Sequence, residues 1–244
     1  MNTRRLLPLG VGLGIGVAGA AAVHAAPSLV ALSSIGRHLS PSLAGVGAKG
    51  HVALTFDDGP DPSSTPAFLD ALDELGWRAT FFMLGERVRS SPGLAAEVAA
   101  AGHEVAVHGD RHRSLLRLSP RTTSDDIRRS RDTIADATGV QPSWYRPPFG
   151  TLSVGGWMAA RKLGLDVVLW TAWGRDWRAE ATPESVVGDV LDGYVDGGTV
   201  LLHDSDCTSA PESWHAALDA LPLLGKELAD RGLTVGPVGE HRIR

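Results

Sequence analysis

The sequence predicts an α/β protein built as a distorted seven-stranded parallel β/α barrel. Short apolar runs alternate with amphipathic stretches, Ser/Thr-Pro pairs precede several of these stretches, and a glycine follows most of them. Strands that alternate with helices pair in parallel through right-handed crossovers. An open doubly wound sheet is the alternative arrangement of the same units.

Seven apolar runs mark the expected strands. Several are continuous rather than alternating, which is typical of parallel strands that are covered on both faces. The runs are HVALTF from His51, ATFFML from Ala79, EVAVH from Glu104, SWYRP from Ser143, DVVLWT from Asp166, TVLLH from Thr199 and LTVGPV from Leu233.

Hydroxyl-proline pairs and glycines predict where the helices begin and end. A Ser or Thr at the N-cap accepts a hydrogen bond from a free helix N–H, and proline suits the first helical position because it has no N–H to leave unpaired. The pairs are Thr65-Pro66, Ser91-Pro92, Ser119-Pro120 and Thr182-Pro183. Glycines that can adopt the left-handed conformation after a helix are Gly76, Gly102, Gly139, Gly164 and Gly232.

Composition restricts the class of protein. The 244 residues include 23 Lys and Arg against 28 Asp and Glu, a net charge of −5, which argues against a basic nucleic-acid binder. The 43% hydrophobic and 21% charged residues are ordinary for one globular domain. The single cysteine, Cys207, excludes an intramolecular disulfide and a cysteine metal cluster, so a bound metal would need nitrogen and oxygen ligands.

The N-terminus has the pattern of an export segment. Arg4 and Arg5 precede residues 6–36, which contain no Asp, Glu, Lys or Arg and begin with an apolar stretch. Residues 1–26 are interpreted as a signal peptide or a membrane anchor, which predicts an exported, secreted or cell-envelope protein whose leader engages the export machinery or the membrane. Residues 27–50 are a Ser/Pro/Gly-rich linker, and residues 51–244 form the barrel domain.

Polar residues gather where the expected strands end. The loops after the carboxyl ends of parallel strands share one rim of such a barrel, so residues far apart in sequence can converge there. This concentration predicts a functional site on that rim, made of Asp57, Asp58, His108, His112, Arg146, Asp176 and His203.

Two of these segments have the chemistry of a metal site. His108 and His112, four residues apart, would stand on the same side of a helical turn and could bind one ion together with a carboxylate. Asp57 and Asp58 follow a strand and point in different directions, so one can bind the ion while the other faces a bound water. Taken alone, the histidines can be surface residues and Asp-Asp-Gly-Pro can be a turn.

Together, five ordered motifs resemble the polysaccharide deacetylase family, the family 4 carbohydrate esterases with a NodB homology domain. The resemblance covers about residues 51–237. Its motifs are Thr55-Phe56-Asp57-Asp58-Gly59-Pro60, His108-Gly109-Asp110-Arg111-His112, Arg146-Pro147-Pro148-Phe149-Gly150, Asp176-Trp177 and Leu201-Leu202-His203.

The resemblance implies a metal-dependent hydrolase. Its metal ligands would be Asp58, His108 and His112, holding a divalent cation for which zinc is expected. Asp57 would be the base that takes a proton from the attacking water, and Arg146 would keep Asp57 ionised and oriented.

The resemblance also implies the acid and the substrate contacts. His203 would protonate the departing amine, with Asp176 keeping it cationic and oriented. The backbone N–H of Phe149 would stabilise the oxyanion. Trp177 and Leu201 would line the pocket for the acetyl methyl group.

The function implied is removal of N-acetyl groups from an N-acetylglucosamine polymer, either peptidoglycan or a chitin-like glycan. Peptidoglycan is preferred because this exported chain shows no separate chitin-binding repeat. The alternatives are an O-acetyl xylan esterase or a cyclic-amide C–N hydrolase on the same fold, and a catalytically silent carbohydrate-binding domain. The sequence does not give the oligomeric state.

Two positions depart from the family pattern. Trp173 stands where the fourth motif often begins with an acidic residue, and this change is expected to alter support of the site or substrate fit. Val107 stands before the first metal histidine where a polar residue is frequent, and little effect is expected from it.

Several other residues have competing interpretations. His103 is expected to be structural because it lies at the far end of its strand from the rim, and Cys207 is expected to be a bystander. Trp173 and Trp214 are the preferred candidates for sugar contacts. Asp206 could bind substrate hydroxyls or cap a turn.

Overall fold

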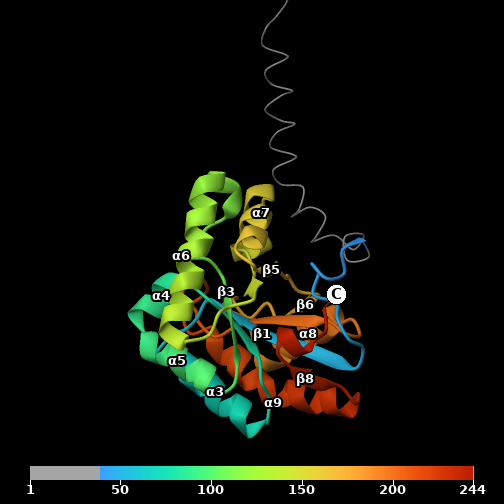
Figure 1. Ribbon diagram of the computed structural model, residues 1–244. Coiled ribbons are helices and arrows are strands. Elements are labelled where there is room, and N and C mark those ends of the chain that lie inside the picture. The colour runs from blue at the N-terminus through green and yellow to red at the C-terminus, as the bar shows by residue number, and fades with distance from the viewer. Residues whose placement is uncertain (1–38, 244) are drawn as a thin grey trace, which may run out of the picture.

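The computed structural model describes residues 39–243 (Figure 1). The predicted leader at 1–26 and the first part of the predicted linker lie outside the described residues. Within residues 39–243, no helix combines the length and the apolar character needed to cross a membrane.

The described strands form one fully parallel sheet, in the order β5–β4–β3–β2–β1–β7–β6, with β8 paired to β1. Every predicted run contains a strand. The strands are β1 (His51–Asp57), β2 (Thr80–Met83), β3 (Glu104–Val107), β4 (Trp144–Tyr145), β5 (Asp166–Val167), β6 (Ala172–Trp173), β7 (Thr199–His203) and β8 (Thr234–Gly236).

The run from Asp166, expected to be one strand over residues 166–171, contains only the short strand β5, and β6 begins directly after the run, at the opposite end of the sheet order. β5 pairs with β4 and β6 pairs with β7, so residues 168–171 connect the two end strands of the curled sheet without strand pairing between them. The strand is interrupted because backbone groups of Val168 and Leu169 bond to partners other than a neighbouring strand. The Arg146 side chain donates to the carbonyls of Val168 and Leu169, at 3.4 and 2.9 Å, and the Leu169 N–H donates to the Leu43 carbonyl at 2.8 Å. This curled parallel sheet, whose end strands are consecutive in the chain, confirms the distorted barrel rather than the open doubly wound sheet.

Helices follow most of the strands, and α6 and α7 lie side by side in Figure 1. The helices are α3 (Thr65–Glu74), α4 (Gly85–Ser90), α5 (Pro92–Ala100), α6 (Pro120–Thr138), α7 (Val154–Lys162), α8 (Pro183–Gly193) and α9 (Trp214–Asp230). Single turns of 3₁₀ helix are η1 (Leu115–Arg117), η2 (Pro148–Gly150) and η3 (Val238–Glu240). The hydroxyl-proline pattern did not indicate α4, α7 or α9, because none of them begins with such a pair.

The predicted helix caps are confirmed in part. Ser119 caps α6 by accepting from the Thr122 N–H, and Thr182 forms a capping box with Ser185 at α8. Ser91 occupies the N-cap of α5 without a side-chain hydrogen bond. The prediction for Thr65 was wrong, since Ser64 is the N-cap and the Thr65 hydroxyl instead donates to Asp204 Oδ2 at 2.6 Å. All five predicted glycines have positive φ, and Gly139, at 71°, caps α6.

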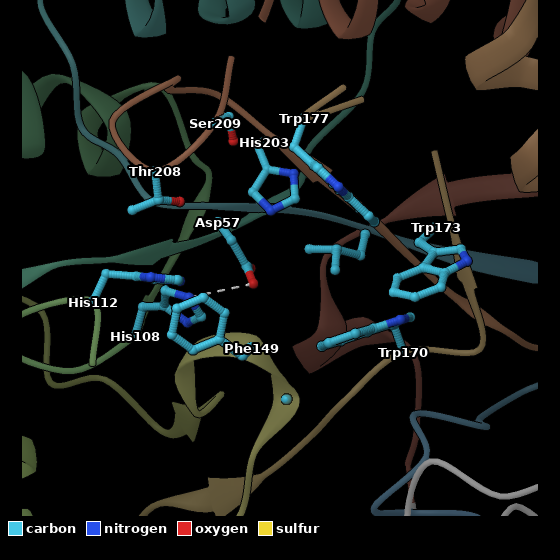
Figure 2. Close-up of a pocket in the computed structure, with 12 residues that line it drawn as sticks. Asp57, His108, His112, Phe149, Trp170, Trp173, Trp177, His203, Thr208 and Ser209 are labelled. Carbon is cyan, nitrogen blue, oxygen red and sulfur yellow. Dashed lines mark ion pairs between the residues drawn. The ribbon is translucent and has the colours of Figure 1, made fainter. Parts of the chain in front are cut away.

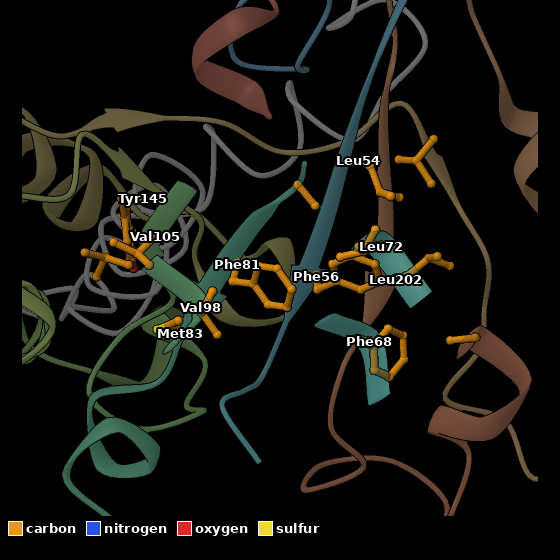
Figure 3. Close-up of a cluster of buried hydrophobic side chains, with 14 of the residues drawn as sticks. Leu54, Phe56, Phe68, Leu72, Phe81, Met83, Val98, Val105, Tyr145 and Leu202 are labelled. Carbon is orange, nitrogen blue, oxygen red and sulfur yellow. The ribbon is translucent and has the colours of Figure 1, made fainter. Parts of the chain in front are cut away.

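The alternation of side chains along β1 divides the core into two parts. Val52, Leu54 and Phe56 contribute to the large apolar cluster between the sheet and its helices, of which Figure 3 shows a part. Ala53 points the other way, into a small cluster with Phe82, Ala106, Val168 and Val238. Each large apolar side chain buried in this way contributes roughly 1.5–3 kcal/mol. By the same alternation Thr55 and Asp57 lie on the Ala53 side of β1, which brings Asp57 to the rim at the carboxyl end of the strand.

The second half of the predicted linker lies against the barrel. The Gly47 N–H donates to the Gly197 carbonyl at 2.8 Å, the Ala48 N–H donates to the His241 carbonyl at 2.7 Å, and Thr199 Oγ1 donates to the Gly45 carbonyl at 2.6 Å. Residues 43–48 are therefore part of the packed body.

Candidate active site

A cavity of about 310 Å³ opens at the carboxyl ends of the strands, where the sequence predicts a site (Figure 2). The Asp57 carboxylate lies near its centre, between His203 and His108 in the view of Figure 2. Eight of the lining residues are predicted site residues or preferred sugar contacts, Gly150 belongs to the third motif, and Trp170, Thr208 and Ser209 complete the lining. The lining consists of Asp57, His108, His112, Phe149, Gly150, Trp170, Trp173, Trp177, Leu201, His203, Thr208 and Ser209.

Asp58, His108 and His112 lie together as predicted. Their ligand atoms all fall within 4.8 Å of one another, and Asp58 Oδ1 lies 3.4 Å from His108 Nε2 and 3.5 Å from His112 Nε2. The Nδ1–H of His108 can donate to the Arg146 carbonyl at 2.9 Å, which leaves Nε2 free to bind.

The chemistry of this cluster fits a divalent cation. Asp58 Oδ1 is buried and has no hydrogen-bond partner among the described residues. A buried carboxylate oxygen without a partner is costly, and a cation shared with two imidazoles would remove that cost. One carboxylate and two imidazoles are also a usual protein ligand set for zinc, with positions left open for water and substrate.

The segment between the two histidines differs from the prediction. Residues 108–112 form a bend, not a turn of helix, in which Gly109 has a φ of 104°. The bend is held by Asp126 of α6, whose Oδ2 accepts from the Asp110 N–H at 2.8 Å. The imidazole rings of His108 and His112 still come within 5.4 Å of each other, so the ligand pair forms by a different local structure.

Thr208 fixes the orientation of Asp58. Its hydroxyl donates to Asp58 Oδ2 at 2.6 Å, which leaves Oδ1 facing the two histidines. Asp58 itself has a φ of 81°, a conformation that is uncommon outside glycine and that is found more often at functional sites. Sequence reasoning missed Thr208 because it lies in the loop after β7, five residues beyond His203, where no motif or period marks it.

Asp57 faces the interior of the barrel and contacts Arg146. Arg146 Nη1 donates to Asp57 Oδ1 at 2.7 Å and to Thr55 Oγ1 at 2.8 Å, and its guanidinium lies 4.0 Å from the centre of the Phe82 ring. Burial raises the pKa of Asp57, while Arg146 acts to lower it. The other oxygen, Oδ2, lies 3.6 Å from His108 Nε2 and faces the cavity.

His203 lies across the cavity from His108 and His112 and is paired with Asp176. Asp176 Oδ1 lies 3.0 Å from His203 Nδ1, and Oδ2 accepts from the His203 backbone N–H at 2.7 Å. Burial opposes the charged form of His203, but the Asp176 carboxylate, together with those of Asp58 and Asp57, outweighs burial and raises the pKa of His203 to about 10. The imidazole is therefore protonated at neutral pH, and its Nε2–H is available to a ligand.

Aromatic side chains form the far wall of the cavity. The rings of Trp170 and Trp173 lie 5.9 Å apart, and those of Trp173 and Trp177 lie 5.2 Å apart. Trp173, which departs from the family pattern, therefore occupies the cavity wall, as expected for a sugar contact. Trp214, the other candidate, does not line this cavity; it stacks on His215 and packs against the core cluster at the start of α9.

The remaining predicted residues have structural surroundings. His103 precedes β3, packs edge-on against Phe81, and lies at the opposite end of the strand from the rim, as expected. Asp206 accepts from the Glu212 N–H at 2.6 Å, which supports its role in capping a turn. Burial raises the pKa of the Cys207 thiol, which lies outside the lining of the catalytic cavity.

Fold and site together define a class of protein: a parallel β/α barrel whose rim carries an aspartate and two histidines beside a second aspartate and a carboxylate-paired histidine. Residues 44–168 match the family model described as polysaccharide deacetylase. The chain belongs to the polysaccharide deacetylase family.

Known relatives act on two kinds of glycan. The chain is 36% identical over 159 residues to a peptidoglycan-N-acetylglucosamine deacetylase of Listeria monocytogenes, covering 65% of this chain and 33% of the relative. It is 35% identical over 195 residues to a chitooligosaccharide deacetylase of Bradyrhizobium, covering 77% of this chain and 88% of that protein. The chain thus spans about a third of the length of the first relative and most of the second.

A solved structure supports the architecture. The crystal structure of the Bc1960 peptidoglycan N-acetylglucosamine deacetylase superposes with a TM-score of 0.76 at 26% identity, covering 82% of this chain and 92% of that one.

Proposed function

We propose that the protein is a divalent-metal-dependent hydrolase that removes N-acetyl groups from a polysaccharide containing N-acetylglucosamine. The observation that carries the proposal is the division of tasks between two adjacent aspartates. Asp58 faces two histidines, whereas Asp57 faces Arg146 and the cavity. A ligand and a base that lie side by side are what hydrolysis by an activated water requires.

Asp58, His108 and His112 would hold the cation, with zinc as the expected ion. When bound, a divalent cation supplies Lewis acidity, which polarises an amide carbonyl and lowers the pKa of water. Asp57 would accept the proton of the attacking water at Oδ2, since Oδ1 is occupied by Arg146. The raised pKa of Asp57 makes it a better proton acceptor than an ordinary exposed aspartate.

His203 would donate its proton to the nitrogen of the departing amine. It is held in its cationic form by Asp176, and a proton donor on the leaving nitrogen is needed because an amide anion is a poor leaving group. Phe149, whose backbone has a left-handed φ of 58° beside His112, would offer its N–H to the oxyanion. Leu201 and Trp177 form an apolar surface suited to a methyl group.

The proposal includes export of the protein. Peptidoglycan and chitin-like polymers lie outside the cell membrane, and the charge-free apolar stretch after Arg4 and Arg5 has the pattern of an export segment. Fractionation of cells that produce the full chain would test this, and retention of all of the protein in the cytoplasm would contradict it.

Release of acetate from N-acetylglucosamine oligomers, with and without a chelator, tests the activity. The purified protein is expected to release acetate, to lose this activity after chelation, and to regain it when zinc is added back. Release of acetate only from acetylated xylan would favour the esterase alternative, and oligomer binding without turnover would favour a silent binding domain.

Two variants separate the proposed roles. Asp57→Asn is expected to retain bound metal and lose about 10²- to 10⁴-fold in turnover, because it removes a positioned base. His112→Ala is expected to lose metal affinity. Metal content by elemental analysis is the discriminating measurement, and wild-type activity in both variants would refute the assigned roles.

A further inference from the structure

A groove of about 530 Å³ adjoins the catalytic cavity on the side away from the tryptophans. His112 and Thr208 line both spaces, so the groove continues directly from the metal cluster. In Figure 2 these two residues lie at the end of the cavity opposite Trp173. An extended polymer whose acetyl group lies in the cavity can therefore reach the groove with a neighbouring sugar.

The groove is lined by several arginines, although the whole chain carries a net charge of −5. Arg87, Arg111 and Arg113 line it, against one acidic lining residue, Glu86. The side chains of these arginines are 32%, 61% and 42% exposed, respectively, so their charges are accessible to a ligand.

Existing ion pairs leave much of this donor capacity unused. Arg87 Nη1 lies 3.4 Å from Asp61 Oδ2, and Arg111 Nε lies 3.6 Å from Glu86 Oε2. Arg113 is the more firmly held, since its Nη2 donates to Asp126. A guanidinium has five N–H donors in a planar fork, so Arg87 and Arg111 keep donors that could bind a further anion.

We propose that this arginine groove binds a carboxylate carried by the glycan near the sugar that is deacetylated. The preferred substrate is then a carboxylate-bearing N-acetylated polymer such as peptidoglycan, rather than a neutral chitin-like one. The inference rests on the proposed function, and it addresses the choice between the two kinds of glycan on which the relatives act. Guanidinium groups recognise carboxylates by charge-assisted, often bidentate hydrogen bonds, which a neutral sugar does not offer.

The two ends of the site are suited to different parts of such a polymer. The wall of Trp170, Trp173 and Trp177 offers flat apolar surfaces that suit sugar faces and acetyl methyl groups. The arginine groove offers charge, and its attraction for a substituent is screened by salt because the side chains are partly exposed. The preference for an anionic polymer should therefore weaken as ionic strength rises.

Three oligosaccharides of equal length test the inference with the full-length protein loaded with zinc. The first is a neutral N-acetylglucosamine oligomer, the second alternates it with a sugar that carries a free lactyl-ether carboxylate, and the third carries a peptide joined through that carboxylate. At low salt, kcat/KM for acetate release is expected to be about tenfold higher on a carboxylate-bearing oligomer, equivalent to ~1.4 kcal/mol. A preference for the second oligomer would show that the groove binds the lactyl carboxylate of the sugar. A preference for the third would show that it binds a carboxylate of the peptide.

The double variant Arg87→Gln/Arg111→Gln is expected to reduce this preference at least about threefold, mainly through a higher KM. Arg87→Lys/Arg111→Lys should retain part of the preference because it keeps the charge. Arg128→Gln is the matched control, since Arg128 is 52% exposed on α6 and lies outside the groove.

Equal kcat/KM on neutral and carboxylate-bearing oligomers, or an unchanged ratio in the double glutamine variant, would overturn the inference while leaving the deacetylase proposal intact. A wild-type protein that releases no acetate from any of the three oligomers would refute the proposed function, and the inference with it. The ratio of two substrates on the same variant corrects for any partial loss of metal or of folded protein.

Discussion

Asp57 and Asp58 are neighbours in the chain but have different surroundings. Asp57 lies in the regular β1 strand, and one of its carboxylate oxygens accepts a hydrogen bond from Arg146. Asp58 has a φ of 81°, and one of its carboxylate oxygens accepts a hydrogen bond from Thr208. In each case one carboxylate oxygen is held by the protein and the other is directed to the cavity or the histidines. The reactive geometry therefore depends on the two donors as well as on the aspartates.

Thr208→Val removes the donor to Asp58 Oδ2 with little change in side-chain volume. We expect affinity for zinc to fall about 10- to 100-fold, the usual effect of removing a hydrogen bond that orients a metal ligand. Competition with a chromophoric chelator would measure the affinity. Thr208→Ser keeps the hydroxyl and is the control, and equal zinc affinity in the valine and serine variants would show that Thr208 does not position Asp58.

Segments remote from the cavity also position the proposed metal ligands. Asp126 lies in α6, where it is almost fully buried, and its carboxylate accepts from the Asp110 N–H and from the Arg113 side chain. Asp110 and Arg113 lie on either side of His112 in the chain, so these contacts hold the segment that carries His112 at both ends. A long helix thus holds a bend that has no regular secondary structure of its own.

Asp126→Asn is expected to destabilise the protein by about 1–3 kcal/mol, because it weakens a charge-assisted hydrogen bond at a buried position. Zinc affinity should fall as well, since the bend that carries His112 is held less firmly. Urea unfolding of the metal-free protein and zinc titration would measure the two effects. Asp125→Asn, on the neighbouring 48% exposed side chain, is the matched control, and an equal response of the two variants would contradict the positioning role.

Sequence patterns predicted where the strands lie better than they predicted where a strand is broken. Every apolar run contains a strand, and the rule that parallel strands end at one rim placed Asp57, His108 and His203 together, because the alternation of strands and helices is a repeated local signal. The break after β5 and the separate strand β6 were missed because they depend on Arg146, which follows β4 and donates to the carbonyls of Val168 and Leu169. The contact of Thr208 with Asp58 spans 150 residues, so no local pattern could indicate it.

At the scale of the whole molecule, His203 at one end of the barrel and the pair of His51 and His241 at the other have pKa values shifted in opposite directions. At the catalytic rim, Asp176 raises the pKa of His203 to about 10. At the opposite end, around the start of β1, His51 and His241 face each other with their Nδ1 atoms 2.7 Å apart, and His241 Nε2 lies 2.7 Å from the Gly197 carbonyl. These contacts suit two neutral rings, with His241 donating to Gly197 and accepting from His51.

Because this histidine pair is neutral, we expect the folded protein to lose stability in acid. Burial lowers the pKa of His241 from 6.5 to about 4, and the neighbouring His51 acts in the same direction. Between pH 6.5 and about 4, the unfolded chain therefore binds more protons at this histidine than the folded chain does. The free energy of unfolding must then fall as pH falls. The stabilising contribution is fully present above pH 6.5 and is lost as pH falls toward 4, with a slope that approaches about 1.4 kcal/mol per pH unit for each proton.

His241→Gln tests this coupling, because glutamine can still donate to the Gly197 carbonyl but does not titrate. The variant is expected to be less stable than the wild type at pH 7.5, where packing of the ring is lost, and to lose less stability between pH 6.5 and 4.5. Urea unfolding followed by tryptophan fluorescence at several pH values would measure both effects. His215→Gln, at an exposed histidine in α9, is the control and should keep the wild-type slope. If the His241→Gln slope equals that of the wild type, the acid sensitivity arises elsewhere in the chain.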